Sequence, residues 1–330
     1  MAEKNLGTLA ALQEVHGKHQ ERVLGLQNVV GVGIGNKMKQ GVDTGELALS
    51  VFVSQKLPGD LIRSADMVPG AIEGVKTDVV ETGPIFAGAG ALGGPAVAEP
   101  QRDVTAEVLT QRVRPALGGF SVGHYQITAG TYATAVYDST PFPGIPQRYY
   151  ILSNNHVLAN SNNAQLGDPI LQPGPYDGGT VATDTIARLS RFVPIQFSTP
   201  TSTPLNFVDA ALAQGNFEQV SREIYWIGYV RGAVAPAIGV TVQKTGRTTN
   251  YTTGRITTVN ATVDVNYGGG KVARFVQQIV TTNMSAPGDS GSLILDLSGQ
   301  AVGLLFAGSS TVTICNDIRY VQSMLGIRIV

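Results

Sequence analysis

The sequence contains very little cysteine and few charged residues. Cys315 is the only cysteine among 330 residues, which excludes a disulfide within the chain and favours a cytoplasmic setting. Charged residues make up 14% of the chain, and the formal net charge is −1. This balance gives no electrostatic reason for binding to nucleic acid or to an anionic membrane surface. We therefore expect neither partner.

Targeting, membrane and metal-binding patterns are also missing from the sequence. Polar residues, among them Gln13 and Lys18, interrupt the N-terminal segment, so no signal peptide is expected. No apolar run approaches the roughly 18 residues that a membrane-spanning helix needs. Histidine and cysteine do not cluster at the spacing of metal ligands. We expect no metal and no other cofactor.

Glycine and proline are abundant, with 40 and 17 residues respectively. From Gly118 onward, short apolar runs alternate with turn residues, a pattern typical of closed antiparallel barrels. We expect one barrel over about 118–220 and a second over about 221–330, with a final helix over about 317–325 that Asn316 caps. The predicted fold class is therefore mainly β, a double antiparallel β-barrel preceded by a small α+β domain.

The first 84 residues have a different pattern from the rest. Apolar residues at spacings of three and four predict a helix over about 4–26. Strands are expected at Val29–Ile34, Leu47–Val53 and Val75–Val80, which gives a small α+β domain over 1–84. Residues 85–117 are rich in glycine, alanine and proline and are interpreted as a linker.

Two glycine patterns in this part resemble nucleotide-binding motifs. The run at 31–35 has the wrong spacing, whereas residues 88–93 match G-x-G-x-x-G literally. A dinucleotide site also needs a helix directly after the motif, and Pro95 and Pro100 interrupt that stretch. We therefore reject a dinucleotide site.

The segment Ala286–Ser292 contains Gly-Asp-Ser-Gly between two apolar runs. Glycines allow a tight bend that brings successive N–H groups to one side. The amides of Gly288 and Ser290 could then stabilise an oxyanion that forms when Ser290 attacks a carbonyl group. Ser290 is the candidate nucleophile, and it needs a histidine base and a carboxylate that orients the histidine.

The candidate base is His156, which directly follows a strand-like apolar run. The candidate acid is Asp209, because apolar residues flank it on both sides. Three other aspartates lie between the base and the nucleophile: Asp168 and Asp177, which we interpret as turn residues, and Asp184, which we expect to be exposed. His124 is expected to form structural hydrogen bonds in the first barrel, and Cys315 to be a small buried apolar residue.

The order His156, Asp209, Ser290 and the contexts of these residues resemble the trypsin/chymotrypsin family of serine proteases. Segments at 29–37, 74–83, 246–249 and 303–309 further resemble bacterial relatives of the plant narrow-leaf trypsin-like proteases. The resemblance implies a serine endopeptidase that cleaves proteins or peptides and forms a homo-oligomer. The alternatives are a regulatory or scaffolding protein with little turnover, and an esterase or acyltransferase.

The resemblance also bears on activation and specificity. In digestive members, the aspartate before the nucleophile pairs with a newly cleaved N-terminus, and no matching Ile-Val-Gly-Gly start occurs near Gly118. Substrate-binding positions map to Met284, Phe306 and Gly308, with no carboxylate among them, so we expect an uncharged residue before the cleaved bond. An acid from elsewhere, such as Asp317, is the alternative.

Overall fold

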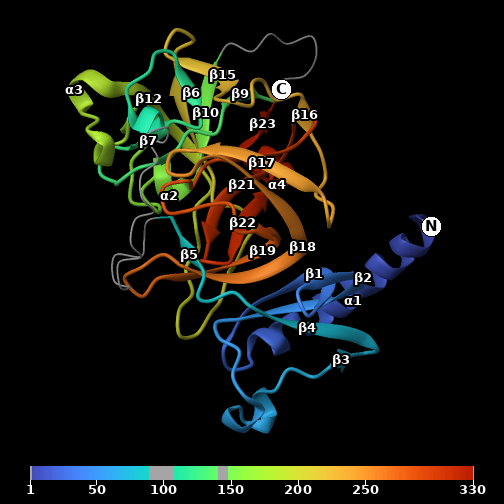
Figure 1. Cartoon of the computed structure of the whole chain (residues 1–330). Coiled ribbons are helices and arrows are strands. Elements are labelled where there is room, and N and C mark those ends of the chain that lie inside the picture. The colour runs from blue at the N-terminus through green and yellow to red at the C-terminus, as the bar shows by residue number, and fades with distance from the viewer. Residues whose placement is uncertain (1, 89–106, 140–147, 330) are drawn as a thin grey trace.

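The computed structural model describes residues 2–88, 107–139 and 148–329, and the side chains from residue 9 onward. Figure 1 shows the N-terminal region in blue at one end of an orange-to-red barrel, with a green barrel at the other end. Most of the linker interpreted from composition, 89–106, lies outside the described residues. The other segments outside them are residue 1, 140–147 and residue 330.

The N-terminal region is a helix packed on a sheet, as the sequence predicts. Helix α1 (Ala2–Leu24) lies against β1 (Val29–Lys39) and β2 (Val42–Val53). Strand β4 (Val75–Glu81) pairs in parallel with β2 and antiparallel with the short β3 (Ala71–Ile72). The helix and sheet share a core of buried apolar side chains: Leu12, Val15, Val23, Val32, Ile34, Leu49 and Val51.

This N-terminal sheet is continuous with the second barrel. Strand β1 pairs antiparallel with β18 (Asn250–Asn266), with Gly31 opposite Val263. A Cβ on Gly33 would lie 2.5 Å from Thr258 Cγ2, so the rejected glycine pattern at 31–35 serves this close contact between strands. The division into domains at 84 stays a prediction, because hydrogen bonds join the two parts.

The second barrel is a closed ring of antiparallel strands. Its order is β17, β18, β19, β22, β21, β20 and back to β17. The bounds not yet given are β17 (Thr241–Gly246), β19 (Val272–Thr282), β20 (Leu293–Asp296), β21 (Gln300–Gly308) and β22 (Val312–Asp317). Three short strands join this sheet: β5 (Phe86–Ala87), β13 (Leu205–Asn206) and β16 (Gly232–Ala233). The start of the predicted linker is thus a strand of the barrel sheet.

The first barrel is built on a separate sheet in the order β23, β9, β10, β14, β12, β11, β7, β8. The bounds are β7 (Ser121–His124), β8 (Gly130–Thr131), β9 (Ala135–Asp138), β10 (Tyr149–Ser153), β11 (Pro169–Leu171), β12 (Thr185–Phe192), β14 (Ala211–Gly215) and β23 (Ile327–Arg328). Strands β6 (Ala116–Gly118) and β15 (Val220–Ile224) pair with each other. Strand β23, close to the C-terminus, follows the second barrel in the sequence but pairs with β9 of the first barrel.

Short helices complete the fold: α2 (Asn155–Leu158), α3 (Val181–Asp184), α4 (Ile318–Leu325) and the 3₁₀ turns Gly59–Leu61, Ser64–Asp66, Glu107–Thr110 and Pro175–Asp177. Helix α4 ends at Gly326 as expected, but its N-cap is Asp317, whose side chain accepts a hydrogen bond from the Arg319 amide. The expectation that Asn316 caps it is wrong because Asn316 is buried in a hydrogen-bond network. Within the described ranges, no helix has the length and apolar character needed to span a bilayer.

Candidate active site

The turn that carries Ser290 depends on its glycines. Gly288 and Gly291 have φ values of +100° and +94°, which side-chain-bearing residues rarely adopt. A Cβ on Gly288 would lie 2.3 Å from Thr248 Oγ1, and one on Gly291 would lie 2.1 Å from Ser153 Oγ. The sequence therefore bends here as the motif predicts, and larger residues do not fit.

The first barrel holds this turn from one side. Thr131 on β8 donates its hydroxyl to the Gly288 carbonyl at 2.9 Å and its amide to the Ser290 carbonyl at 2.7 Å. The carbonyl of Thr131 accepts a hydrogen bond from Ser153 Oγ at 2.7 Å. Ser153 ends the strand that precedes His156. Thr131 therefore connects the nucleophile turn with the strand before the candidate base.

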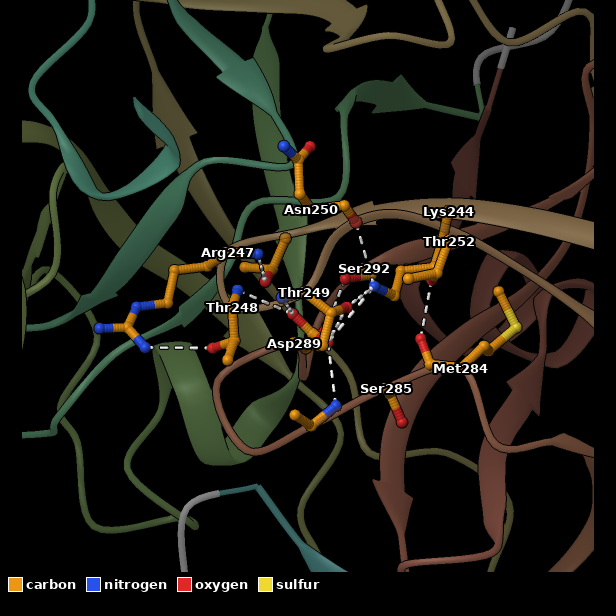
Figure 2. Close-up of polar contacts among 12 residues, drawn as sticks. Lys244, Arg247, Thr248, Thr249, Asn250, Thr252, Met284, Ser285, Asp289 and Ser292 are labelled. Carbon is orange, nitrogen blue, oxygen red and sulfur yellow. Dashed lines mark hydrogen bonds and ion pairs between the residues drawn. The ribbon is translucent and has the colours of Figure 1, made fainter. Parts of the chain in front are cut away.

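Asp289 and Lys244 form an ion pair inside the second barrel. Figure 2 shows Lys244 on β17 reaching the carboxylate of Asp289 in the nucleophile turn. The Nζ–Oδ2 distance is 3.3 Å, and both side chains are fully buried. The Asp289 carboxylate also accepts hydrogen bonds from the amides of Thr248, Thr249 and Ala286 and from the Thr249 hydroxyl.

The charge on Lys244 is costly to bury. Burial lowers the pKa of Lys244 below its ordinary value, although the Asp289 carboxylate opposes that shift. Lys244 also donates hydrogen bonds to the Thr249 hydroxyl and the Asn250 carbonyl, so its ammonium group is well solvated by protein atoms. Lys244 thus supplies Asp289 with an ammonium partner from within the second barrel. Sequence reasoning did not find this lysine.

The candidate base and acid are in direct contact. His156 lies on the short helix α2, directly after β10, and Asp209 lies between β13 and β14. The distance from His156 Nδ1 to Asp209 Oδ2 is 2.6 Å, and the backbone amide of His156 donates to Oδ1 at 3.1 Å. Asp209 is fully buried, whereas the His156 side chain is 12% exposed. Asp209 therefore fixes the His156 ring through Nδ1, which leaves Nε2 on the opposite side of the ring.

Two residues far away in the sequence complete the surroundings of Asp209. The Tyr267 hydroxyl, from the loop between β18 and β19, donates to Asp209 Oδ2 at 2.7 Å. Burial of that hydroxyl raises the pKa of Tyr267 well above its ordinary value, and the Asp209 charge adds to this effect. Asn316 Oδ1 accepts the Asp209 amide at 3.0 Å. No local motif marks either residue, so sequence reasoning missed both.

The free nitrogen of His156 and the hydroxyl of Ser290 converge on Gly88. Nε2 is buried and has no hydrogen-bond partner among the described residues. The position of a Cβ on Gly88 lies 2.7 Å from Nε2 and 3.5 Å from Ser290 Oγ. Ser290 Oγ donates a long bond of 3.5 Å to the Phe306 carbonyl. Such contacts are often long in unliganded sites and tighten only with substrate.

Two of the three residues expected to form the substrate pocket have buried side chains. Met284 is 4% exposed and packs in a core cluster of the second barrel with Ile256 and Leu305. Phe306 is fully buried against Phe275, with ring centroids 4.7 Å apart. Gly308 lies at the end of β21 and pairs with Phe86. The role of these residues in specificity stays a prediction.

The remaining candidates have structural contacts. His124 is buried and bonds Asp168 at 3.0 Å, whereas Asp177 pairs with Arg247. The expected exposure of Asp184 is wrong, because it is 6% exposed and accepts the Thr180 amide at the start of α3. The Asp317 carboxylate pairs with Arg319.

Cys315 is buried as expected, and burial raises the pKa of its thiol. In the part of the chain that the structure describes, histidine, cysteine and acidic side chains form no group that could hold a metal ion.

Comparison with known proteins supplies the family. The trypsin-like peptidase domain matches residues 134–304, which is more than half of the chain. The chain belongs to the trypsin-like peptidase family. The double barrel is the fold of that family, and His156, Asp209 and Ser290 all lie within the matched residues.

Individual relatives share parts of this trypsin-like chain. Serine protease 2 of Streptomyces fradiae is 43% identical over 84 residues, which cover 25% of this chain and 39% of the relative's length. Protease A of Thermobifida fusca has a TM-score of 0.46 at 17% identity and covers 65% of this chain and 97% of its own. A chymotrypsin of Cellulomonas bogoriensis has a TM-score of 0.43 at 19% identity, covering 65% and 97%.

Proposed function

We propose that the protein is a serine endopeptidase with His156, Asp209 and Ser290 as its catalytic triad. Ser290 Oγ attacks the carbonyl carbon of a peptide bond while His156 Nε2 takes the hydroxyl proton. The amides of Gly288 and Ser290 hold the oxyanion. His156 then returns the proton to the leaving amine, and a water molecule hydrolyses the acyl-enzyme by the same steps.

One observation carries this proposal: the His156 imidazole is bound to a buried carboxylate through Nδ1, and Nε2, which has no hydrogen-bond partner among the described residues, lies near Ser290. A buried carboxylate without a cationic partner favours the imidazolium that forms as the serine loses its proton. The Tyr267 hydroxyl donates to Asp209 and holds its carboxylate, and the Thr131 hydroxyl donates to Gly288 and holds the nucleophile turn against the first barrel. The arrangement supports acyl transfer through a serine nucleophile.

Labelling with a fluorophosphonate probe tests the proposal. The native protein should form a covalent adduct on Ser290, and Ser290→Ala and His156→Ala should each abolish labelling and lower peptidase turnover by several orders of magnitude. Ser285→Ala is a matched control, because Ser285 lies on the same loop and bonds Thr313. A label on another residue, or equal turnover by Ser290→Ala, would contradict the assignment. An adduct without peptide hydrolysis would favour an esterase or a scaffold.

We propose peptides with an uncharged residue before the cleaved bond as substrates. The three residues expected to line the substrate pocket, Met284, Phe306 and Gly308, carry no carboxylate, and burying an unpaired cation costs several kcal/mol. Asp317, the alternative acid, pairs with Arg319. A digest of a peptide library should show cleavage after Ala, Val, Leu or Met. A dominant preference for Arg or Lys would refute this specificity.

We also propose that residues 1–84 are a permanent part of the active protein. The pairing of β1 with β18 supports this, because removing the region would expose a strand of the second barrel. Mass spectrometry of the purified active protein should find the full chain. An active species that begins after residue 84 would contradict it. Sedimentation of the same sample tests the proposed homo-oligomer.

A further inference from the structure

Strand β5 lies along the edge of the second barrel next to the candidate nucleophile. Ala87 pairs antiparallel with Ala307, and Phe86 with Gly308. On its other side, β5 pairs in parallel with β18, where the Asn266 amide donates to the Ile85 carbonyl at 2.9 Å. The segment is therefore an extended chain between two strands of the barrel sheet (Figure 1), which is how a peptide binds by strand addition.

The direction of β5 leads toward the catalytic groups. Continuing the antiparallel register by one residue places Gly88 opposite Phe306, whose carbonyl accepts the Ser290 hydroxyl. Gly88 has a φ of +51°, and the position of its Cβ lies 2.7 Å from His156 Nε2 and 2.9 Å from Cδ2. No side chain fits between Gly88 and the imidazole. Gly88 thus lies against both candidate catalytic side chains.

Buried contacts hold the segment in this position. Ile85 and Ala87 are 2% and 3% exposed and belong to the apolar cluster that also contains Phe306. At the start of the segment, the Thr82 amide donates to the Val53 carbonyl at 2.9 Å, and the Thr311 hydroxyl donates to the Thr82 carbonyl at 3.2 Å. The segment is therefore anchored on the N-terminal sheet and on the loop that follows β21.

We propose that Phe86–Gly88 is an internal ligand of the peptide-binding edge of β21, and that a substrate binds only after this segment has left. The inference rests on the proposed function, because it takes Ser290 and His156 as the catalytic pair. The same edge of β21 cannot pair with β5 and with a substrate at once. A covalently attached ligand also has a high effective concentration, so a free peptide competes at a disadvantage.

The size of the effect follows from the population of the open form. If the segment occupies the edge in nine molecules of ten, the apparent affinity for substrate and the rate of active-site labelling both fall about tenfold. A residue that cannot coexist with the His156 ring should shift the population to the open form. Gly88→Val introduces such a clash, because its Cβ would overlap Nε2.

Gly83→Val is the matched control. Gly83 lies in the same segment and also has a positive φ, +73°, but a Cβ there meets no atom within 4 Å. Both variants therefore place a side chain at a positive φ, and only the one at Gly88 contacts the site. The second measurement is hydrogen exchange of the Asn266 amide and of residues 85–88 in a Ser290→Ala background, where catalysis plays no part.

Gly88→Val should react with the fluorophosphonate probe about tenfold faster than the native protein, with faster exchange at Asn266, and Gly83→Val should match the native protein. Equal labelling of native protein and Gly88→Val overturns the proposal. If exchange at Asn266 is also unchanged, the valine fits and the contact between Gly88 and His156 is wrong. If exchange is faster but labelling is not, the segment does not obstruct the substrate-binding edge. If exchange shows release and Ser290 still fails to react, the proposed nucleophile is wrong.

Discussion

Each of the two barrels contributes a fully buried aspartate to the candidate site, but the groups that stabilise the carboxylate charge differ. In the first barrel, Asp209 accepts hydrogen bonds from the His156 backbone and the Tyr267 hydroxyl and contacts the His156 ring. In the second barrel, Asp289 has Lys244 at 3.3 Å and four further donors. One carboxylate thus has a lysine beside it, and the other contacts an imidazole that becomes a cation only during the proposed reaction.

This difference separates a chemical role from a structural one. A buried carboxylate that lacks a permanent cation favours protonation of the neighbouring imidazole, which is what general-base catalysis by His156 requires. A buried carboxylate that is paired with a lysine does not stabilise a charge that forms on the histidine. Its hydrogen bonds to backbone amides instead fix the turn that it belongs to. The two aspartates should therefore respond differently when each is neutralised.

Asp209→Asn should have the largest effect among the variants that test this comparison. An asparagine keeps the shape but favours the wrong histidine tautomer and leaves the imidazolium unstabilised, so kcat should fall by about 10⁴-fold. The thermal unfolding midpoint should change little in comparison. The measurement is turnover of a peptide substrate alongside thermal unfolding. Near-normal turnover would show that another residue is the acid.

Lys244→Met should have the next largest effect. Removing the cation leaves the Asp289 carboxylate buried and unpaired, which costs about 3–5 kcal/mol of stability. The turn that carries the Gly288 and Ser290 amides then relaxes, and losing oxyanion stabilisation lowers kcat by about 10²–10³-fold. Chemical denaturation and steady-state kinetics measure the two losses.

The double variant Lys244→Met, Asp289→Asn is the control for that experiment. Neutralising both partners removes the unpaired charge, so the double variant should be more stable than Lys244→Met alone. A double variant no more stable than the single one would mean that Lys244 contributes packing and not charge. Among the described residues, Asp209 forms no ion pair with a lysine, so Asp209→Asn has no second substitution of this kind that would restore stability.

Alkaline pH should separate activity from stability. Since burial lowers the pKa of Lys244, the native state releases this proton at a lower pH than the unfolded state does. Between the lowered value and the ordinary 10.5, the unfolded chain binds more protons, so this group makes folding more favourable as pH rises. Activity should fall over the same window, because Asp289 loses its cation. A fall in activity that follows unfolding instead would contradict this.

Local motifs predict the part of this site that depends on short stretches of sequence. The glycines on either side of Asp289 and Ser290 allow the positive φ values that this turn needs, so the turn is predictable from one segment. The apolar neighbours of Asp209 predict a buried carboxylate, and Asp209 is fully buried; its role as the acid stays a prediction. The fold class followed in the same way from short apolar runs and turn residues, and the barrel sheets confirm it.

Partners brought together by strand pairing were not predictable in this way. Lys244, Tyr267 and Asn316 lie on three different elements of the second barrel, and each reaches its aspartate only after the barrel has closed. The same reason explains β5: its composition is that of a linker, and it is a strand because two barrel strands offer it hydrogen bonds. The composition of a segment is local information, whereas its strand pairing depends on neighbours that are distant in the sequence.

Tyr267→Phe should have the smallest effect and sharpen the comparison most. The hydroxyl donates to Asp209 Oδ2, the oxygen that also binds His156 Nδ1 at 2.6 Å, so it shares the charge that the imidazolium needs. Phenylalanine keeps the ring contacts with Phe197 and His156, whose centroids lie 5.4 and 6.1 Å from that of Tyr267. Packing should survive.

Without the hydroxyl, more negative charge on Oδ2 faces the imidazole and favours its protonated form. The acid limb of the kcat/KM profile should therefore move to higher pH, while kcat on the plateau falls by about tenfold or less because the unoriented carboxylate gains freedom. Tyr225→Phe is the matched control and should leave the profile unchanged, because the Tyr225 ring packs against Phe120. A purely structural role for Tyr267 would lower kcat at every pH without moving the limb.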